Sequence, residues 1–201
     1  MPKMVNHDER KVLIAEAAFR TIKHYGIENT TLRKVAEEAG FSLGSIQYYF
    51  PTQRDLFIFS MEVIEQRALE RIVGSVQDGD PALEGVVSML KPFIPSSDQD
   101  QRVEIESWLS LSLIALKEPE LGQISLNLHQ KTLEFMILVI TILQNNGLMN
   151  DGIHVDSEAK NLFAFIDGLT LQAILYPGIY DNEMIENRIE HYVRNICDRK
   201  R

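Results

Sequence analysis

Residues 30–50 read TTLRKVAEEAGFSLGSIQYYF, and this stretch decides the fold of the first part of the chain. Gly40 stands between two short segments with helical apolar spacing, where a sharp turn needs a residue that tolerates positive φ. Ala36, four residues earlier, is small enough to let two helices cross closely. The stretch therefore predicts a helix-turn-helix. The apolar side chains expected to face inward are Leu32, Val35, Ala39, Phe41 and Ile46.

Local signals on both sides of the turn set the ends of three helices. Apolar residues at spacings of three and four predict a first helix over 8–25. Asn29-Thr30-Thr31 supplies N-cap candidates for a second helix, which is predicted to follow them and run to about Glu38. Ser42 is suited to cap a third helix. That helix should stop at Phe50, because the following Pro51 disfavours helical geometry there.

The rest of the chain carries the same helical spacing and few strand signals. Thr52 and Asp55 have the spacing of a capping box and open a long helix, and Asp80-Pro81 opens a later one. We expect an all-α fold of about nine helices, with a three-helix helix-turn-helix domain at 1–51 joined by the long helix to a body at 52–201. The helices expected in the body span 52–76, 81 to about 91, 99–117, 119–146, 156–176 and 181–198.

The net charge of −9 on 201 residues is unevenly distributed. Residues 1–55 hold eight Lys and Arg against seven Asp and Glu, and the remainder holds twelve against twenty-two. A near-neutral head can bind DNA through local placement of its cations, while an acidic body is kept away from the phosphates. The overall acidity therefore does not exclude a nucleic-acid partner.

The sequence favours a cytoplasmic protein without a membrane partner. The N-terminal residues MPKMVNHDERK are polar and unlike a signal peptide. The longest apolar run, Phe135 to Leu143 with Thr141 inside it, is shorter than the roughly 20 residues that span a bilayer. Cys197 is the single cysteine, so no intrachain disulfide is possible, which suits a reducing compartment.

The stretch TTLRKVAEEAGFSLGSIQYYFPTQRDLF, residues 30–57, resembles the signature of the tetracycline-repressor (TetR) family of regulators. It departs from the family pattern at Phe41, Gln47 and Gln53, where Val, Tyr and Lys are common. Loss of the Lys removes a phosphate-binding cation, although Arg54 is adjacent. The matching residues are Thr30, Thr31, Val35, Ala36, Ala39, Gly40, Ser42, Gly44, Tyr49, Phe50 and Leu56.

A narrower similarity involves residues outside the helix-turn-helix. Thr52-Gln53, together with Glu-Ser-Trp at 106–108 and DGLTLQ at 167–172, is similar to the subgroup typified by betaine-pathway repressors. The resemblance implies a sequence-specific transcriptional regulator that binds a palindromic double-stranded operator as a homodimer. It also implies release of the DNA by a small-molecule effector, through a shift between two body shapes. Repression is the usual effect in the family, and activators also exist.

Helix-turn-helix geometry and the resemblance together assign the DNA contacts. Gln47 is expected to read a base, because Gln pairs bidentately with adenine, and Leu43 is placed to touch a thymine methyl group. Gly44 lets the backbone approach the DNA closely. Phosphate contacts position the protein without reading sequence. The complete set expected at the DNA is Thr31, Arg33, Ser42, Leu43, Gly44, Ser45, Gln47, Tyr48, Tyr49, Thr52 and Arg54.

The resemblance also assigns roles in the body, where the last two helices should pair with those of a second subunit and other helices should enclose an effector of unknown identity. No cofactor or metal is expected. Trp108 with Glu104 or Asp167 would suit an organic cation. The stripes expected at the dimer interface are Leu162, Ile166, Leu169, Ala173, Ile185, Ile189, Tyr192 and Ile196, which would alternatively face the chain's own core. The residues expected at the effector are Met89, Phe93, Trp108, Leu111, His129, Phe135, Met136, Phe163 and Asp167.

The sequence also bears on two other functions, an enzyme and a regulator without a small-molecule effector. A carboxylate or metal enzyme built on a helical bundle is disfavoured, because none of the five histidines stands three residues after a glutamate and no phosphate-binding glycine loop or Gly-x-Ser-x-Gly is present. A DNA-binding protein that responds to a protein partner, or to no ligand, fits the same motifs. A thermal-shift measurement against metabolites would separate that alternative from an effector-responsive regulator.

Overall fold

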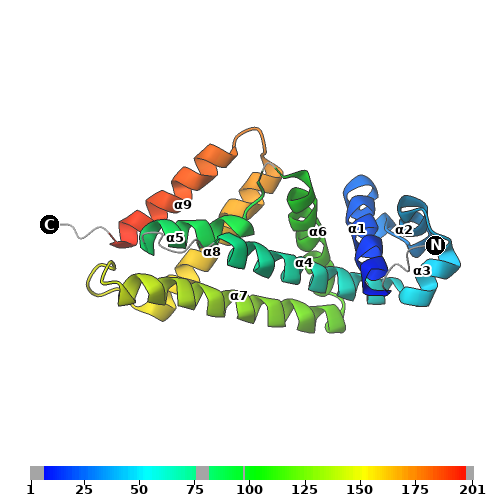
Figure 1. Ribbon diagram of the computed structural model, residues 1–201, viewed down its shortest axis with the longest axis horizontal. Coiled ribbons are helices and arrows are strands. Elements are labelled where there is room, and N and C mark those ends of the chain that lie inside the picture. The colour runs from blue at the N-terminus through cyan, green and yellow to red at the C-terminus, as the bar shows by residue number, and fades with distance from the viewer. Residues whose placement is uncertain (1–6, 76–81, 97, 198–201) are drawn as a thin grey trace, which may run out of the picture. The chain divides into compact units, whose positions relative to one another are not determined.

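The computed structural model describes residues 7–75, 82–96 and 98–197, and these residues are helical with connecting turns and no strand (Figure 1). The predicted all-α class is confirmed, and the observed helix ends lie within two residues of the predicted ones wherever both are described. The expected helix opening at Asp80-Pro81 lies outside the described residues. The α-helices are α1 His7–Tyr25, α2 Leu32–Ala39, α3 Leu43–Tyr49, α4 Gln53–Ser75, α5 Ala82–Leu90, α6 Gln99–Ala115, α7 Pro119–Asn145, α8 Val155–Leu175 and α9 Asn182–Cys197, with short 3-10 helices η1 Ile27–Asn29 and η2 Lys91–Phe93.

The chain forms two compact units. The first contains Met1–Arg67 and Asp100–Leu126, and the second contains Ala68–Gln99 and Asn127–Arg201. Helices α4 and α7 each run from one unit into the other. This grouping by contacts differs from the predicted functional division between residues 51 and 52, which stays a prediction.

The helix-turn-helix of the first unit is built around a small apolar core. Val35 and Ile46 are fully buried there, and Ala36 is buried where α2 approaches its neighbours, as the sequence indicated. Leu32, Ala39 and Phe41 pack partly buried against the same core. Helix α1 contributes Ile14, Ala17 and Ala18, and Phe50 and Leu56 complete the cluster.

Side-chain caps and one glycine define the short helices. The Thr31 hydroxyl accepts a hydrogen bond from the Lys34 amide (3.3 Å), and the Ser42 hydroxyl accepts one from the Ser45 amide (3.1 Å). These bonds satisfy amides that a helix leaves without partners at its start. Gly40 ends α2 in the left-handed region, at φ 69°. The predicted turn and caps are therefore confirmed.

Helix α4 begins with a reciprocal cap. The Thr52 amide donates to the Asp55 carboxylate (2.9 Å), and the Asp55 amide donates to the Thr52 hydroxyl (3.1 Å). The predicted capping box is thus present, with Asp in the position that Glu often holds. Only Phe50 and Pro51 separate the end of α3 at Tyr49 from the capping residue Thr52, so α4 follows α3 closely.

Helix α6 joins the first unit by packing against α1 and α4. Phe19, Met61 and Leu111 are buried members of one cluster that includes side chains from all three helices. The same three helices are also joined by Arg67 of α4, which donates to Glu16 of α1 (2.5 Å) and to Glu104 of α6 (2.6 Å). The head and α6 are therefore held together by both apolar and ionic contacts.

The second unit has a larger core, formed by α5, the second part of α7, α8 and α9. Seven of the eight residues predicted at the dimer interface belong to it and are at most 8% exposed: Leu162, Ile166, Leu169, Ala173, Ile185, Ile189 and Ile196. The eighth, Tyr192, is half-buried and donates to the Glu158 carboxylate (2.6 Å). These side chains pack within their own chain, which leaves them little surface for a partner, and the dimer interface itself stays a prediction.

Helix α7 is the longest helix of the described residues. It contains an 18-residue window of mean hydropathy 1.2, which by length and composition alone would suffice to cross a membrane, although the apolar run at 135–143 was expected to be too short. Met136, Val139, Ile140 and Leu143 of this helix are fully buried in the core of the second unit. Packing inside the protein thus accounts for these four residues, although only 22% of the apolar window is buried.

The two glycines of the helix-turn-helix give opposite predictions for stability. Gly40→Ala should lower the free energy of unfolding by about 1–2 kcal/mol, because a side chain is strained at φ 69°. Gly44→Ala should raise it by about 0.5–1 kcal/mol, because the residue lies inside α3 and the added Cβ meets no atom within 4 Å. Urea unfolding of both variants measures the difference. Equal effects of the two substitutions would contradict the left-handed turn at Gly40.

Candidate nucleic-acid interface

Helix α3 has one buried face and one exposed face, and the exposed face carries most of the predicted DNA contacts. Ile46 points into the core, whereas Leu43, Gly44 and Gln47 are exposed and Tyr48 is 74% exposed. Ser42, just before the helix, is also exposed, and Ser45 is half-buried. A short helix with an exposed outer face that includes a glycine and a glutamine has the dimensions to enter a major groove.

Three hydroxyl groups predicted at the DNA serve as helix caps. The hydroxyls of Thr31 and Ser42 accept hydrogen bonds from amides. Each such hydroxyl keeps one O–H donor, which a phosphate oxygen can accept. Thr52 differs, because its O–H donates to the Asp55 carboxylate (2.7 Å). Capping and phosphate binding are therefore compatible at Thr31 and Ser42, and at Thr52 they compete.

The two arginines predicted at the phosphates already have acidic partners. Arg33 pairs with Glu37 one helical turn away (3.3 Å), and both side chains are well exposed. Such a pair contributes little energy, so a phosphate can replace the carboxylate. Arg54 is held by two acidic residues near the α6–α7 connection, Glu118 (3.5 Å) and Glu120 (3.0 Å). Sequence reasoning missed this pairing, because more than sixty residues separate the partners along the chain.

A group of aromatic rings extends the exposed end of α3. The rings of Tyr48 and Tyr49 meet edge to face, with centroids 5.1 Å apart. His7, the first residue of α1, lies 4.7 Å from the Tyr49 centroid and 6.1 Å from that of Tyr48. His7 was absent from the predicted site, and no motif spacing connects it with α3. Phe50, by contrast, is buried and packs against Phe59.

The second unit brings together some of the residues predicted at the effector. Phe93 and Phe135 lie 5.5 Å apart, and the His129 ring stacks on Phe163 at 5.0 Å. Asp167 is four residues beyond Phe163 on α8 and therefore on the same side of the helix. Partial burial of this carboxyl raises the pKa of Asp167 to about 6, and the nearby His129 acts in the opposite direction, although the residue as a whole is exposed.

Other predicted effector residues are placed differently. Met136 is fully buried in the core of the second unit, Met89 is partly buried against that core, and Trp108 packs with the apolar cluster of the first unit, where Leu111 is fully buried. Glu104, suggested as a partner for an organic cation, is instead bound to Arg67. Glu104 is therefore neutralised within the protein, and Asp167 is the better placed of the two suggested carboxylates.

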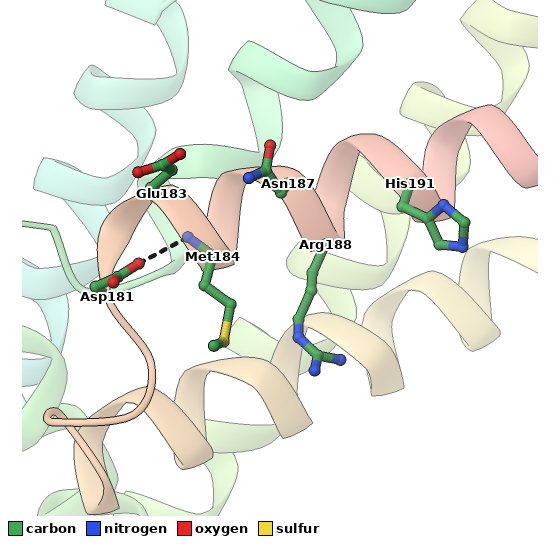
Figure 2. A pocket seen from close by; sticks show the side chains of 6 residues that line it. All are labelled: Asp181, Glu183, Met184, Asn187, Arg188 and His191. Atoms are coloured by element: carbon green, nitrogen blue, oxygen red, sulfur yellow. Dashed lines mark hydrogen bonds between the residues drawn. The ribbon is translucent and has the colours of Figure 1, made fainter.

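An open, polar pocket of about 560 Å³ lies along the first half of α9. Figure 2 shows the side chains that line it, which come from α9 and the residue before it. Asp181 accepts a hydrogen bond from the Met184 amide (2.8 Å) and so caps the helix. None of the residues predicted at the effector lines this pocket, and its mixed charges come from Asp181, Glu183, Arg188 and His191.

Comparisons with known proteins agree with this arrangement of a helix-turn-helix and a helical body. Residues 14–58 match the domain described as bacterial regulatory proteins of the tetR family, and residues 82–198 match the C-terminal domain of the BetI-type transcriptional repressor. The HTH-type transcriptional regulator PksA of Bacillus subtilis (strain 168) is 33% identical over 198 residues, which cover 98% of this chain and 94% of the relative.

Two more distant proteins cover almost the same length. The HTH-type transcriptional regulator BetI of Stenotrophomonas maltophilia (strain R551-3) is 25% identical over 190 residues, which cover 91% of this chain and 90% of the relative. A transcriptional regulator from Saccharomonospora viridis, solved in complex with choline, has the same fold with a TM-score of 0.85 at 23% identity, and the match covers 96% of this chain and all of that one. With both domains matched and a relative similar along nearly its whole length, the chain belongs to the TetR family of transcriptional regulators.

Proposed function

We propose that this TetR-family regulator is a repressor that binds a palindromic operator as a homodimer and leaves it when a small organic cation binds the body. The observation that carries the proposal is the exposed face of α3, with Leu43, Gly44, Gln47 and Tyr48 outward and Ile46 inward. Because Gln47 presents an amide on this face, it can pair with adenine in a major groove. Gly44 leaves open space where a side chain would otherwise stand.

A second subunit would supply the second head that a palindromic site needs. The buried stripes of α8 and α9 leave a different face of α8 exposed. Leu171, Leu175, Tyr176 and Ile179, at and beyond the end of α8, are large apolar residues in contact with solvent. Gly168, where an added Cβ would meet nothing within 4 Å, lies one turn before Leu171. An apolar face of this kind fits a symmetric interface, in which the same patch covers itself.

The carboxyl of Asp167 and the stacked rings of His129 and Phe163 support an organic cation as the effector. Aromatic faces attract a cation, and a carboxylate beside them adds an attractive charge. The relative from Saccharomonospora viridis binds choline, a cation of this class. The chemistry of these three side chains is thus compatible with a quaternary ammonium ligand.

Effector binding can reach the head through continuous helices. Asp167, His129 and Phe163 belong to the second unit, and α4 and α7 run from that unit into the first. A ligand shifts a conformational equilibrium only if it binds one state better than the other. We propose that the cation favours a body shape in which α4 holds the two heads at a spacing that does not match the operator.

The DNA proposal is tested by fluorescence anisotropy with the DNA that flanks the protein's own gene, at several salt concentrations. We expect one discrete site whose affinity falls with salt. Gln47→Ala should lose about 1–3 kcal/mol of discrimination between this site and unrelated DNA. Gly44→Ala should bind more weakly despite its greater stability. Gln130→Ala, an exposed glutamine on α7, is the control and should bind as the wild type does. Sequence-blind binding by the wild-type protein would contradict the proposal.

Dimerisation is tested by sedimentation of two matched variants. Leu175 of α8 is 55% exposed and Leu138 of α7 is 53% exposed, so a glutamate at either position is tolerated by the isolated chain. Leu175→Glu should give monomers, because it places a charge in the proposed interface, whereas Leu138→Glu should remain dimeric. A wild-type protein that sediments as a monomer at micromolar concentration, or a dimeric Leu175→Glu, would refute this interface.

The effector proposal is tested by thermal unfolding with choline at pH 8 and pH 5. The pKa of about 6 leaves Asp167 ionised at pH 8 and protonated at pH 5, so choline should stabilise the protein at pH 8 and far less at pH 5. At about 100 times the dissociation constant, the rise in Tm should be roughly 5 °C or more. Asp167→Asn should abolish the shift, and Asp156→Asn, an exposed site on the same helix, should keep it. An equal shift in Asp167→Asn would exclude this site.

A further inference from the structure

His7 brings the start of α1 against the exposed end of α3. Its ring centroid lies 4.7 Å from that of Tyr49, with the two planes tilted by 53°, and 6.1 Å from that of Tyr48, in an edge-to-face arrangement. Tyr48 and Tyr49 are themselves edge to face at 5.1 Å. The three rings therefore form one cluster, which we call the His7 cluster, with contacts between every pair.

The His7 cluster lies where order is otherwise hard to obtain. Tyr48 is 74% exposed and belongs to the last turn of α3, a helix of only seven residues. A side chain with so few neighbours samples several rotamers in the free protein, and fixing it on DNA costs conformational entropy. Aromatic contacts at 4.5–7 Å in tilted or edge-to-face geometry are favourable, so the neighbouring rings restrict Tyr48 before DNA arrives.

We propose that His7 is a positioning residue for DNA recognition, whose ring holds Tyr48 and Tyr49 in the orientation that the operator requires. The proposal rests on the proposed function, since it takes both tyrosines to be at the DNA. It depends on the ring and not on charge, because the nearest charged partner of His7 is Asp8, 3.9 Å away and well exposed. A ring contact at this place shifts part of the ordering cost from binding to folding.

The same helix carries a natural control. His24, near the other end of α1, meets Tyr25 of the same helix edge to face at 6.3 Å. Both histidines are exposed, and each pairs with tyrosine. Substitution of His24 therefore removes an equivalent ring from α1 without touching the His7 cluster.

The experiment measures operator affinity by fluorescence anisotropy for the full chain and its variants, with urea unfolding of each. His7→Ala should bind about three- to tenfold more weakly, a loss typical of an aromatic pair. His7→Phe should recover wild-type affinity to within about twofold, and His24→Ala should stay within the same limit. The free energy of unfolding should change little in all three, because His7 is exposed.

A double-mutant cycle separates positioning from an independent contact. Tyr48→Ala should weaken binding, and adding His7→Ala to it should cost much less than His7→Ala does in the wild-type background. Strictly additive losses, a His7→Phe variant as weak as His7→Ala, or wild-type affinity in His7→Ala would each overturn the proposal. If the wild-type protein binds no operator at all, the proposed function fails first and the role of His7 fails with it, whereas normal wild-type binding with any of the three results above rejects only His7.

Discussion

The double hydrogen bond of Arg67 is the interaction on which the first unit depends. One guanidinium nitrogen donates to Glu16 of α1 and another to Glu104 of α6, a residue whose side chain is only 5% exposed. Burial disfavours the charged guanidinium, but the two carboxylates outweigh this effect and raise the pKa of Arg67 above its usual value. An unpaired carboxylate at the depth of Glu104 would cost about 3–5 kcal/mol. Any stable packing of α6 against the head must therefore keep Arg67 between the two acids, which fixes three helices relative to one another.

This constraint explains why the compact units do not follow the order of the sequence. The helix-turn-helix motif and Pro51 predict a head that ends near residue 51. The contacts of Glu16, Arg67 and Glu104 join segments that lie 37 and 51 residues apart along the chain. Local spacing carries no information about such pairs. The sequence therefore predicted the elements, but it could not predict that α6 packs with the head instead of with the rest of the body.

Predictions succeeded where a local physical requirement selects the residue. Gly40 adopts the left-handed turn, Ser42 and Thr52 cap their helices, and Val35 and Ile46 are buried, because each role depends on neighbours within a few positions. The partner of the apolar stripes on α8 and α9 could not be predicted in this way. A 4-3 spacing shows that a helix has an apolar face, but it does not show whether that face meets the same chain or another. Ile166 and Ile189 are buried in the core of the second unit. Leu171 and Leu175 lie on a different face of α8 and are exposed.

The recognition surface combines limited phosphate anchoring with pre-ordered side chains. Gln53 stands where the family commonly has a lysine, and Arg54 is bound to Glu118 and Glu120, so two positions at the start of α4 contribute little positive charge toward DNA. Electrostatic attraction is the main source of sequence-independent affinity, so a head with fewer available cations gains less from phosphates. A larger share of its affinity must then come from contacts on the exposed face of α3, where the cost of ordering side chains counts directly against binding. A ring that restrains Tyr48 and Tyr49 in the free protein is worth most in a head of this kind, which connects the weak phosphate anchoring at one end of the motif with the His7 cluster at the other.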